Sequence, residues 1–432
     1  MGTAEHDPRR AGSAPMAGAR SLQVSQRGSA EQSKEDGLGG SFMNRWLATL
    51  PMLFLCTVAL AQDGEEVRLD SPDLEGWHAH GSGVWEWRDE AIWCNGEGGG
   101  WLRSDRIYTD FTLRFEYKIE PRGNSGVWLR APIRGRASSV GFEFQILGTR
   151  ADNPSNHSTG SLYDLLAPDV EAGRPAGEWN QVEVTCIGSR VRAVLNDVEL
   201  YDVDLREIEE NETIPLGRKP RERSHRGYIG LTNHGAQVWY RQVYIQEHPQ
   251  EGFHELPLGE ELGGWSVRGD EPQPAAYSVD EGTLSARASD GSILASDEVV
   301  EDYTLRLRYR TSPGAEGLLH IRFDEDRDRY VLAIALADDE DAQPSDTASG
   351  ALYEYGAPRY VNALPTGQWN DLEIVYRGWD LSVWLNGSPV LDGSLLWYSG
   401  FNGQPRRGAI GIEALAGEIE FSEIQVGPAP EE

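Results

Sequence analysis

The chain has 432 residues and carries 70 Asp and Glu against 39 Lys and Arg, a formal net charge of −31 at pH 7. This balance excludes nucleic acids and anionic membrane surfaces as partners, because both require clustered cations. With 39% hydrophobic residues, including 14 Trp, 16 Tyr and 10 Phe, the chain is too rich in core-forming side chains to be disordered. Its length predicts two to three domains, and the 49 Gly and 23 Pro favour short strands joined by tight turns.

The N-terminal 61 residues differ from the rest of the chain. Residues 1–42 are rich in Gly, Ser, Arg and Ala without apolar periodicity, so we expect them to be disordered or to be upstream translation before the true start. Residues 43–61 combine a basic start, an apolar run and the small-residue pattern Ala59-Leu60-Ala61, which predicts a secretory signal peptide cleaved near Ala61. No second apolar stretch follows, so we expect a secreted or periplasmic protein without a membrane span.

The three cysteines give little further information on the cellular compartment of the protein. Cys56 lies in the predicted signal peptide, and the bulky Leu55 before it disfavours lipoprotein processing. Cys94 and Cys186 each lie in a strand-like apolar stretch, and the sequence leaves open whether they form a disulfide or stay as separate thiols.

The rest of the chain is a tandem repeat of one domain-sized unit. Blocks that begin at residues 159, 175 and 189 recur at 349, 365 and 379, an offset of 190 residues. A period of this length is a whole domain rather than a solenoid repeat. The matched blocks are DFTLRFEYKI (110–119) with DYTLRLRYRT (302–311), TGSLYDLLAP (159–168) with SGALYEYGAP (349–358), and PAGEWNQVEV (175–184) with PTGQWNDLEI (365–374). We predict two domains, at 66–247 and 254–427, with the linker between them.

Each copy has the pattern of an all-β domain. Apolar residues take every second place in runs such as 111–117 and 182–186, which is the period of a half-buried strand. The sequences Leu195-Asn-Asp-Val198 and Leu385-Asn-Gly-Ser388 predict hairpin turns, because Asn, Asp and Gly tolerate the positive φ of primed turns. No segment predicts a long amphipathic helix, so we expect two tandem jelly-roll sandwiches.

Five motifs of the first copy together resemble a known family. They are GNSGVWLR (123–130), GFEFQIL (141–147), HSTGSLYDLLAP (157–168), PAGEWNQVEV (175–184) and GYIGLTNHGAQVWYRQVYI (227–245). In order and spacing they resemble the 3-keto-disaccharide hydrolases, exported bacterial proteins with a fold like that of the concanavalin A-like lectins and glucanases. The second copy resembles the family more faintly, so we expect it to be a degenerate repeat. The resemblance implies attack on 3-keto glycosides, by elimination to a 2-hydroxy-glycal and its hydration, which amounts to hydrolysis.

This chemistry requires particular kinds of side chain in the site. The C3 ketone acidifies the C2 proton, so the site needs a base, a donor to the enolate oxygen and an acid near the leaving group. In 142–146, Glu143 and Gln145 alternate with apolar residues, and we expect both on the exposed, concave face of the sandwich, with Glu143 as the base. An ordinary solvated strand face is the alternative. In the second copy we align Val331 and Ala333 with these two residues, so that copy lacks the carboxylate.

The strand 123–130 supplies three candidates for substrate binding. Alternation predicts that Trp128 and Arg130 face outward, where the indole can stack on a sugar ring and the guanidinium can donate to a ketone or hydroxyl. The alternative is a core indole and a solvating arginine. Asn124 lies in the turn before the strand, and turn formation alone also explains an Asn there.

The remaining candidates lie in loops. His157 has an imidazole that titrates near neutral pH and can act as base or acid, although a surface loop is the simpler explanation. Tyr163 can donate from its phenol, and His234 is a minor candidate for the site. The resemblance implies an acidic residue after the strand that ends at 147, where this chain has Gly148, and Asp152 can take its place in substrate binding.

We expect no metal and no cofactor. Asp and Asn recur in the loops and are compatible with bound calcium, but no spacing of the EF-hand kind occurs. The expected partner is an oxidised di- or oligosaccharide, and we expect a monomer. A non-catalytic, lectin-like carbohydrate-binding protein is the alternative to the enzyme, because the same fold serves both classes.

Overall fold

The computed structural model describes residues 64–134, 137–208, 219–220, 223–289, 291–324, 329–340, 342–398 and 406–430. The predicted signal peptide and the segment before it lie outside the described residues. Within the described ranges, no helix has the length and apolar character needed to span a membrane. The sequence-based prediction of an all-β chain is confirmed, since the described α-helix, α1 (Ala137–Val140), has four residues.

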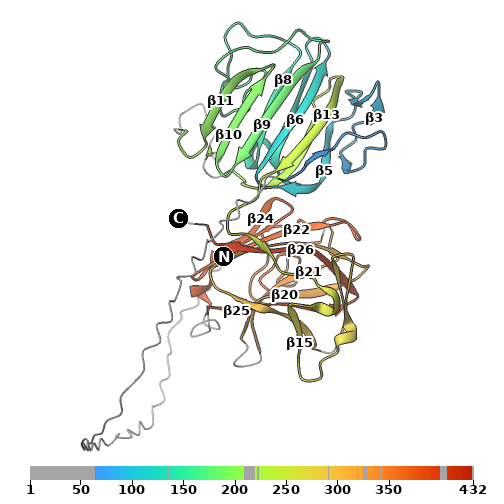
Figure 1. Ribbon diagram of the computed structural model, residues 1–432, viewed down its shortest axis with the longest axis vertical. Helices are drawn as coiled ribbons and strands as arrows, with labels where there is room; N and C mark the ends of the chain where they lie inside the picture. The colour runs from blue at the N-terminus through green and yellow to red at the C-terminus, as the bar shows by residue number, and fades with distance from the viewer. Residues whose placement is uncertain are drawn as a thin grey trace, which may run out of the picture. The chain divides into compact units, whose positions relative to one another are not determined.

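The first copy forms two antiparallel sheets that face each other (Figure 1). The larger sheet has the strand order β11-β10-β9-β6-β13-β4-β3, with β1 paired to β13, and the smaller sheet has the order β2-β5-β12-β7-β8. In chain order the strands are β1 (Glu66–Arg68), β2 (Trp77–His80), β3 (Trp85–Arg88), β4 (Ala91–Cys94), β5 (Gly100–Tyr108), β6 (Phe111–Ile119), β7 (Asn124–Ala131), β8 (Phe142–Leu147), β9 (Asn180–Ile187), β10 (Arg190–Leu195), β11 (Val198–Asp204), β12 (Gly227–Asn233) and β13 (Val238–Glu247).

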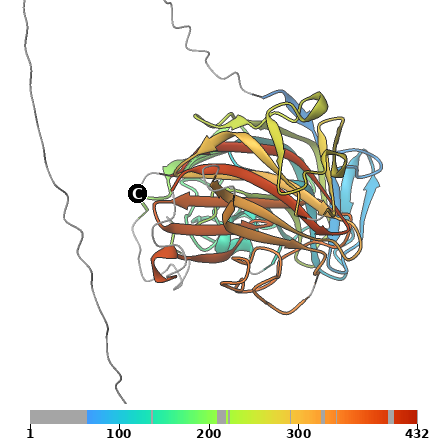
Figure 2. The same cartoon turned by 90° about the horizontal axis from the view of Figure 1, so that it is seen from below.

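The second copy repeats this arrangement. Its larger sheet has the order β16-β17-β26-β19-β22-β23-β24, with β14 paired to β26, and its smaller sheet has the order β15-β18-β25-β20-β21. Figure 2 shows the curvature of its long orange and red strands. The strands are β14 (His254–Glu255), β15 (Trp265–Arg268), β16 (Tyr277–Asp280), β17 (Thr283–Arg287), β18 (Ile293–Val300), β19 (Tyr303–Thr311), β20 (Glu316–Asp324), β21 (Arg329–Ala337), β22 (Asn370–Arg377), β23 (Asp380–Leu385), β24 (Ser388–Ser394), β25 (Gly408–Ala416) and β26 (Glu418–Pro428).

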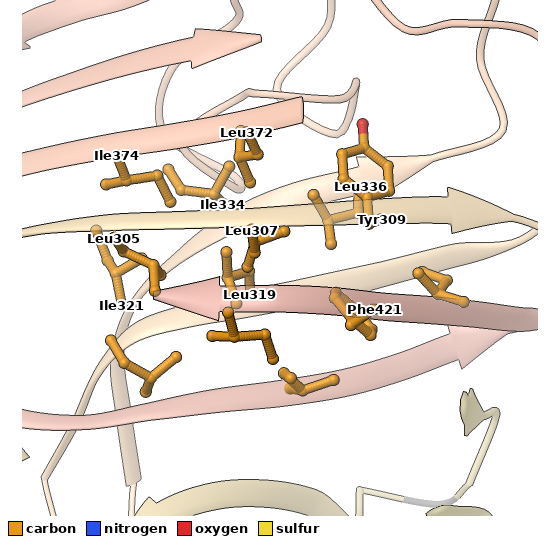
Figure 3. Packing of buried hydrophobic residues seen from close by; sticks show 14 of the residues in the cluster. Leu305, Leu307, Tyr309, Leu319, Ile321, Ile334, Leu336, Leu372, Ile374 and Phe421 are labelled. Atoms are coloured by element: carbon orange, nitrogen blue, oxygen red, sulfur yellow. The ribbon is translucent and has the colours of Figure 1, made fainter. Parts of the chain in front are cut away.

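The alternating apolar residues build the core between the two sheets of each sandwich. In β6 the residues Phe111, Leu113, Phe115 and Tyr117 are at most 2% exposed. In the second sandwich, side chains of β19, β22 and β26 meet those of β20 and β21 between the sheets (Figure 3). Burial of this apolar surface is the dominant favourable term in folding, so the period-2 pattern fixes which face of each strand points inward.

Both predicted hairpin turns are confirmed. Asn196 and Asp197 have φ of 50° and 67° between β10 and β11, and Asn386 and Gly387 have φ of 51° and 75° between β23 and β24. Positive φ at both central positions is the requirement of a type I′ turn, which these residue types meet with least strain.

The structure corrects the alignment of the two copies at one strand. The amide of Tyr163 donates to the carbonyl of Glu143 (2.9 Å), and in the second sandwich the amide of Tyr353 donates to the carbonyl of Ala333 (3.0 Å). Ala333 therefore corresponds to Glu143, and Ala335 corresponds to Gln145 by the same reasoning. The predicted pairing with Val331 and Ala333 was wrong by two residues, which preserves the strand face and so leaves the alternation intact. The conclusion that the second copy lacks this carboxylate still holds.

The two cysteines of the first sandwich do not form a disulfide. Cys94 on β4 and Cys186 on β9 are free thiols, both fully buried in the core of the first sandwich. Burial raises the pKa of Cys186 to about 11, so this thiol stays protonated at neutral pH and packs as a small apolar side chain.

Candidate active site

One face of the smaller sheet of the first sandwich collects the predicted residues. Across the strands, Glu143 on β8 pairs in register with Trp128 on β7, and Trp128 pairs with Gly230 on β12. On the other side of β8, an isolated bridge joins Phe144 to Leu162, which extends the sheet by one short segment. Because Phe144 and Leu162 point into the core, their chain neighbours Glu143 and Tyr163 lie on the opposite face. Tyr163, Glu143 and Trp128 are thus neighbours on that face, which we call the first face.

Glu143 is paired and buried rather than exposed. Its Oε1 lies 3.2 Å from Nε2 of His234, and the residue is only 4% exposed. The sequence placed Glu143 and Gln145 on the correct face, but the expected exposure was wrong, since both are buried. Gly126 on β7 helps to explain this, because a Cβ there would lie 2.4 Å from Oε1 of Glu143. A glycine opposite Gln145 therefore gives the carboxylate room to lie flat against the sheet.

A tight turn after β12 presents His234 to Glu143. The Asn233 side chain accepts a hydrogen bond from the amide of Gly235 (3.0 Å) and donates to the carbonyl of Glu97 (2.8 Å). Gly235 has a φ of 88°, which glycine adopts without strain. The sequence Asn-His-Gly thus fixes the imidazole at the edge of the first face, and His234 becomes a principal member of the site.

Aromatic side chains continue the site from Glu143 toward β5. The Trp128 ring lies 6.5 Å from the His234 ring and 5.0 Å from the Trp101 ring, measured between centroids. Gly230 accommodates Trp101, since a Cβ at Gly230 would lie 2.2 Å from the indole. Trp128 therefore faces outward as predicted, half-buried and in ring contact with His234.

A second pair of titratable groups stands beside Tyr163. His157 Nε2 lies 2.7 Å from Oδ1 of Asp164, and the imidazole ring lies 5.0 Å from the Tyr163 ring. An ionised carboxylate only accepts hydrogen bonds, so Nε2 carries the hydrogen and Nδ1 of the neutral ring can accept a proton. His157 is exposed, whereas the Asp164 side chain is 16% exposed, so the partly buried carboxylate orients the accessible imidazole.

Of three further predicted residues, Gln145 and Asn124 are joined by a hydrogen bond, whereas Asp152 lies in a loop. Gln145 Nε2 donates to Oδ1 of Asn124 at 2.7 Å, which joins the amide side chains of β8 and β7 on the first face. Asp152 is exposed in the loop after β8, and the described residues show no hydrogen bond or ion pair that joins it to the other candidates.

The predicted outward position of Arg130 is wrong. Its guanidinium is 1% exposed and donates to the carbonyls of Thr109 (2.8 Å) and Gly188 (2.6 Å) and to Asp110 (3.1 Å). Arg130 has a φ of 51°, which interrupts the alternation of β7 and turns the side chain away from the first face. In the second sandwich His320 pairs with a glycine as Trp128 does, and Arg322, two residues later, is also a buried arginine. Arg130 therefore belongs to the framework.

Sequence reasoning missed Asp164 and Trp101. Asp164 has a φ of 62°, and its counterpart Glu354 has a φ of 63°, so an acidic residue follows the tyrosine in both copies. That repeated acidic position was a usable signal, whereas nothing in the sequence marks Trp101 as a neighbour of Trp128. In the described part of the chain, no group of three or more His, Cys, Asp or Glu side chains is arranged to hold a metal ion.

Fold and site together define a concanavalin A-like sandwich with a buried carboxylate beside an imidazole on one sheet face. The chain belongs to the family described as 3-keto-alpha-glucoside-1,2-lyase-like domain, whose sequence profile matches residues 64–246 and 252–427. The second copy is thus a recognisable member as well, as the fainter resemblance predicted.

Individual relatives are distant. A 3-keto-disaccharide hydrolase of Bacteroides thetaiotaomicron is 23% identical over 227 residues, which is 43% of this chain and 78% of the relative. A candidate glycosyl hydrolase from Parabacteroides distasonis is 20% identical with a TM-score of 0.39, over 43% of this chain and 100% of that one. The carbohydrate-binding module CBM66 from Bacillus subtilis is 15% identical with a TM-score of 0.28, over 40% of this chain and 96% of that one.

Proposed function

We propose that the first sandwich cleaves 3-keto glycosides by elimination followed by hydration, with net hydrolysis of the glycosidic bond. The observation that carries the proposal is the buried Glu143 carboxylate, 3.2 Å from the His234 imidazole on the face that also holds Tyr163. The relative that is named a 3-keto-disaccharide hydrolase supports the substrate class.

In the elimination step, Glu143 removes the C2 proton of the substrate. The C2–H electrons form the enolate, whose oxygen at C3 receives a hydrogen bond from the Tyr163 phenol. The enolate then forms the C1–C2 double bond and expels the glycosidic oxygen, which takes a proton from the His157 imidazolium. Asp164, 2.7 Å from His157, stabilises that imidazolium. The products are a 2-hydroxy-glycal ketone and the free alcohol.

Hydration reverses these proton movements. His157 takes a proton from water while the water oxygen bonds to C1, and the carboxyl group of Glu143, whose proton has exchanged with solvent, gives a proton to C2. His234 positions the Glu143 carboxylate by donating from Nε2. The Trp128 indole offers a flat apolar surface for one sugar ring, while Gln145 and Asn124 can bond hydroxyl groups.

The first test is the variant Glu143→Gln in the full chain. An amide of the same shape cannot accept the proton, so we expect kcat on a 3-keto disaccharide to fall by about 10²- to 10⁴-fold without loss of fold. The matched control is Glu116→Gln, because Glu116 lies on the other sheet and contacts Arg241 at 2.7 Å. Normal turnover by a folded Glu143→Gln protein contradicts the proposal. Sugar binding without any turnover by the wild type favours the lectin-like alternative.

Turnover in D₂O tests the mechanism separately from the activity. Elimination and hydration place deuterium at C2 of the released keto sugar, whereas direct hydrolysis leaves C2 protonated. The control is the same keto sugar incubated without enzyme, which measures spontaneous exchange. Cleavage without deuterium at C2 contradicts the elimination and leaves a simple hydrolase.

We also propose that the protein is exported as a monomer after cleavage near Ala61. The apolar run in 43–61 supports export, and mass spectrometry of the secreted protein is expected to give an N-terminus at Gln62. A cytoplasmic protein that retains residues 43–61 contradicts export, and sedimentation of a dimer contradicts the monomer.

A further inference from the structure

The second sandwich carries a titratable pair on the corresponding face of its smaller sheet. Leu319 and Ile321 of β20 and Ile334 of β21 point into the core (Figure 3). Because side chains alternate along a strand, His320 and Ala333 lie on the opposite face, which we call the second face. In register, His320 pairs with Ala333 on one side and with Gly411 of β25 on the other.

His320 is bonded to a carboxylate on the neighbouring strand. Its Nε2 lies 2.9 Å from Oε2 of Glu413, and the two side chains are 4% and 12% exposed. Burial lowers the pKa of His320, so the ring is neutral at pH 7 and donates from Nε2 to the Glu413 carboxylate. The second copy therefore lacks the carboxylate of Glu143 but has a carboxylate and an imidazole of its own, contributed by different strands.

The sandwich fold does not require this pair. Trp128 and His320 occupy equivalent places, because each pairs with a glycine of the neighbouring strand, Gly230 and Gly411 respectively. Two residues beyond those glycines, Thr232 corresponds to Glu413. The first copy thus folds with an indole and a hydroxyl where the second has an imidazole and a carboxylate. Burying two titratable groups costs desolvation free energy that apolar residues avoid, so framework stability does not account for the pair.

The residues around the pair are small where the first face has large polar ones. Ala333 and Ala335 replace Glu143 and Gln145. Ala295, which pairs with Gly411 on β18, replaces the arginine that pairs with Gly230 on β5. Tyr353 keeps the position of Tyr163, since its amide bonds to the carbonyl of Ala333.

Tyr353 and His320 thus lie two strand positions apart, with Ala333 between them. Neighbouring strands are about 4.8 Å apart, so their backbones are separated by about 10 Å. The side chain between them ends at Cβ. That separation suits one sugar ring, with the Tyr353 phenol at one side and the His320–Glu413 pair, of which Glu413 is the more exposed, at the other.

We propose that the second face is a separate carbohydrate-binding site, in which Tyr353 and the His320–Glu413 pair bind one neutral sugar ring above Ala333. A carboxylate accepts from sugar hydroxyls, and a phenol both donates to them and packs against the apolar ring face. The choice of a sugar as the ligand class rests on the proposed function of the first sandwich.

The test is histidine NMR on the full chain with a first-site variant as background. Protein labelled with ¹⁵N-histidine and carrying Glu143→Gln is titrated with cellobiose, maltose and their 3-keto derivatives. His320→Gln identifies the His320 signals by their loss. We expect at least one of these sugars to shift the His320 signals in a saturable manner. Glu413→Gln is expected to weaken the binding at least tenfold, and Ala333→Leu is expected to abolish the shift by placing a larger side chain between Tyr353 and His320.

The control is Glu418→Gln on the other sheet, where Glu418 forms a surface ion pair with Arg287 at 3.0 Å. It is expected to leave the sugar-induced shift unchanged. His320 signals that none of the sugars moves overturn the proposal, as does an unchanged shift in a folded Ala333→Leu protein. These outcomes do not depend on turnover, so they are distinct from a failure of the first site, which the activity of the wild type measures.

Discussion

A methyl group at Gly126 tests whether the position of the Glu143 carboxylate matters. The variant Gly126→Ala changes no group that touches substrate. An ideal Cβ at this position would lie 2.4 Å from Oε1 of Glu143, 2.9 Å from Cγ and 3.1 Å from the carboxyl carbon. Real Cβ atoms are not found closer than 3.0 Å to a nonbonded heavy atom of a residue elsewhere in the chain, so the Glu143 side chain must move.

The size of the effect follows from these contacts. Relief of the 2.4 Å contact moves the carboxylate by about 1 Å, and a misplacement of that size costs about 10²-fold in rate. The cost to stability is small, about 1 kcal/mol, because the closest atom is the end of a flexible side chain. We therefore predict that Gly126→Ala greatly lowers kcat but lowers the stability of the fold only slightly.

The assay is kcat on a 3-keto disaccharide together with thermal unfolding of the same preparations. Gly393→Ala is the matched control, since a Cβ at Gly393 meets no heavy atom within 4 Å. It is expected to leave both quantities unchanged. If Gly126→Ala keeps the wild-type kcat, either Glu143 is not the base or its position is not critical, and the reasoning from this contact is refuted.

Three further outcomes test the other pairs. His157→Ala should lower kcat by about 10²- to 10⁴-fold, and Asp164→Asn should lower it less, since the imidazole remains; a loss below threefold for His157→Ala makes it an ordinary loop residue. Arg130→Met should lower the free energy of unfolding in urea by about 3–5 kcal/mol, because it leaves the Asp110 carboxylate without its buried cation, and a loss below about 1 kcal/mol contradicts a framework role. Burial lowers the pKa of His320 below 6.5, so the unfolded state binds more protons as pH falls below 6.5 and stability is lost in that range. Between pH 7 and pH 5, Tm of the wild type should therefore fall further than Tm of His320→Gln, and equal decreases contradict this assignment.

Much of the fold follows from local patterns in the sequence. The alternation in strands such as β6 fixes their inward face, and the residue pairs Asn196-Asp197 and Asn386-Gly387 fix two hairpins. The 190-residue offset predicts two copies of one domain. Each of these signals acts within one or two strands, so it can be read without knowledge of distant neighbours.

The site was predictable only in part, because its contacts join distant segments. Alternation places Glu143 on the correct face, but its burial depends on Gly126 and His234, which lie on other strands or turns. For Arg130, alternation predicts the wrong face, because a positive φ at that residue interrupts the alternation of the strand.

Periodicity and turn chemistry are properties of neighbouring residues, so the β-sandwich architecture, the repeat and the candidate side chains could be predicted from local patterns. Which of the candidates meet depends on how the strands pair. Strand pairing brought His234 to Glu143 across 91 residues of chain, and it placed His320 beside Glu413 across 93. Contacts at such separations are set by the register between strands, which no short stretch of sequence records.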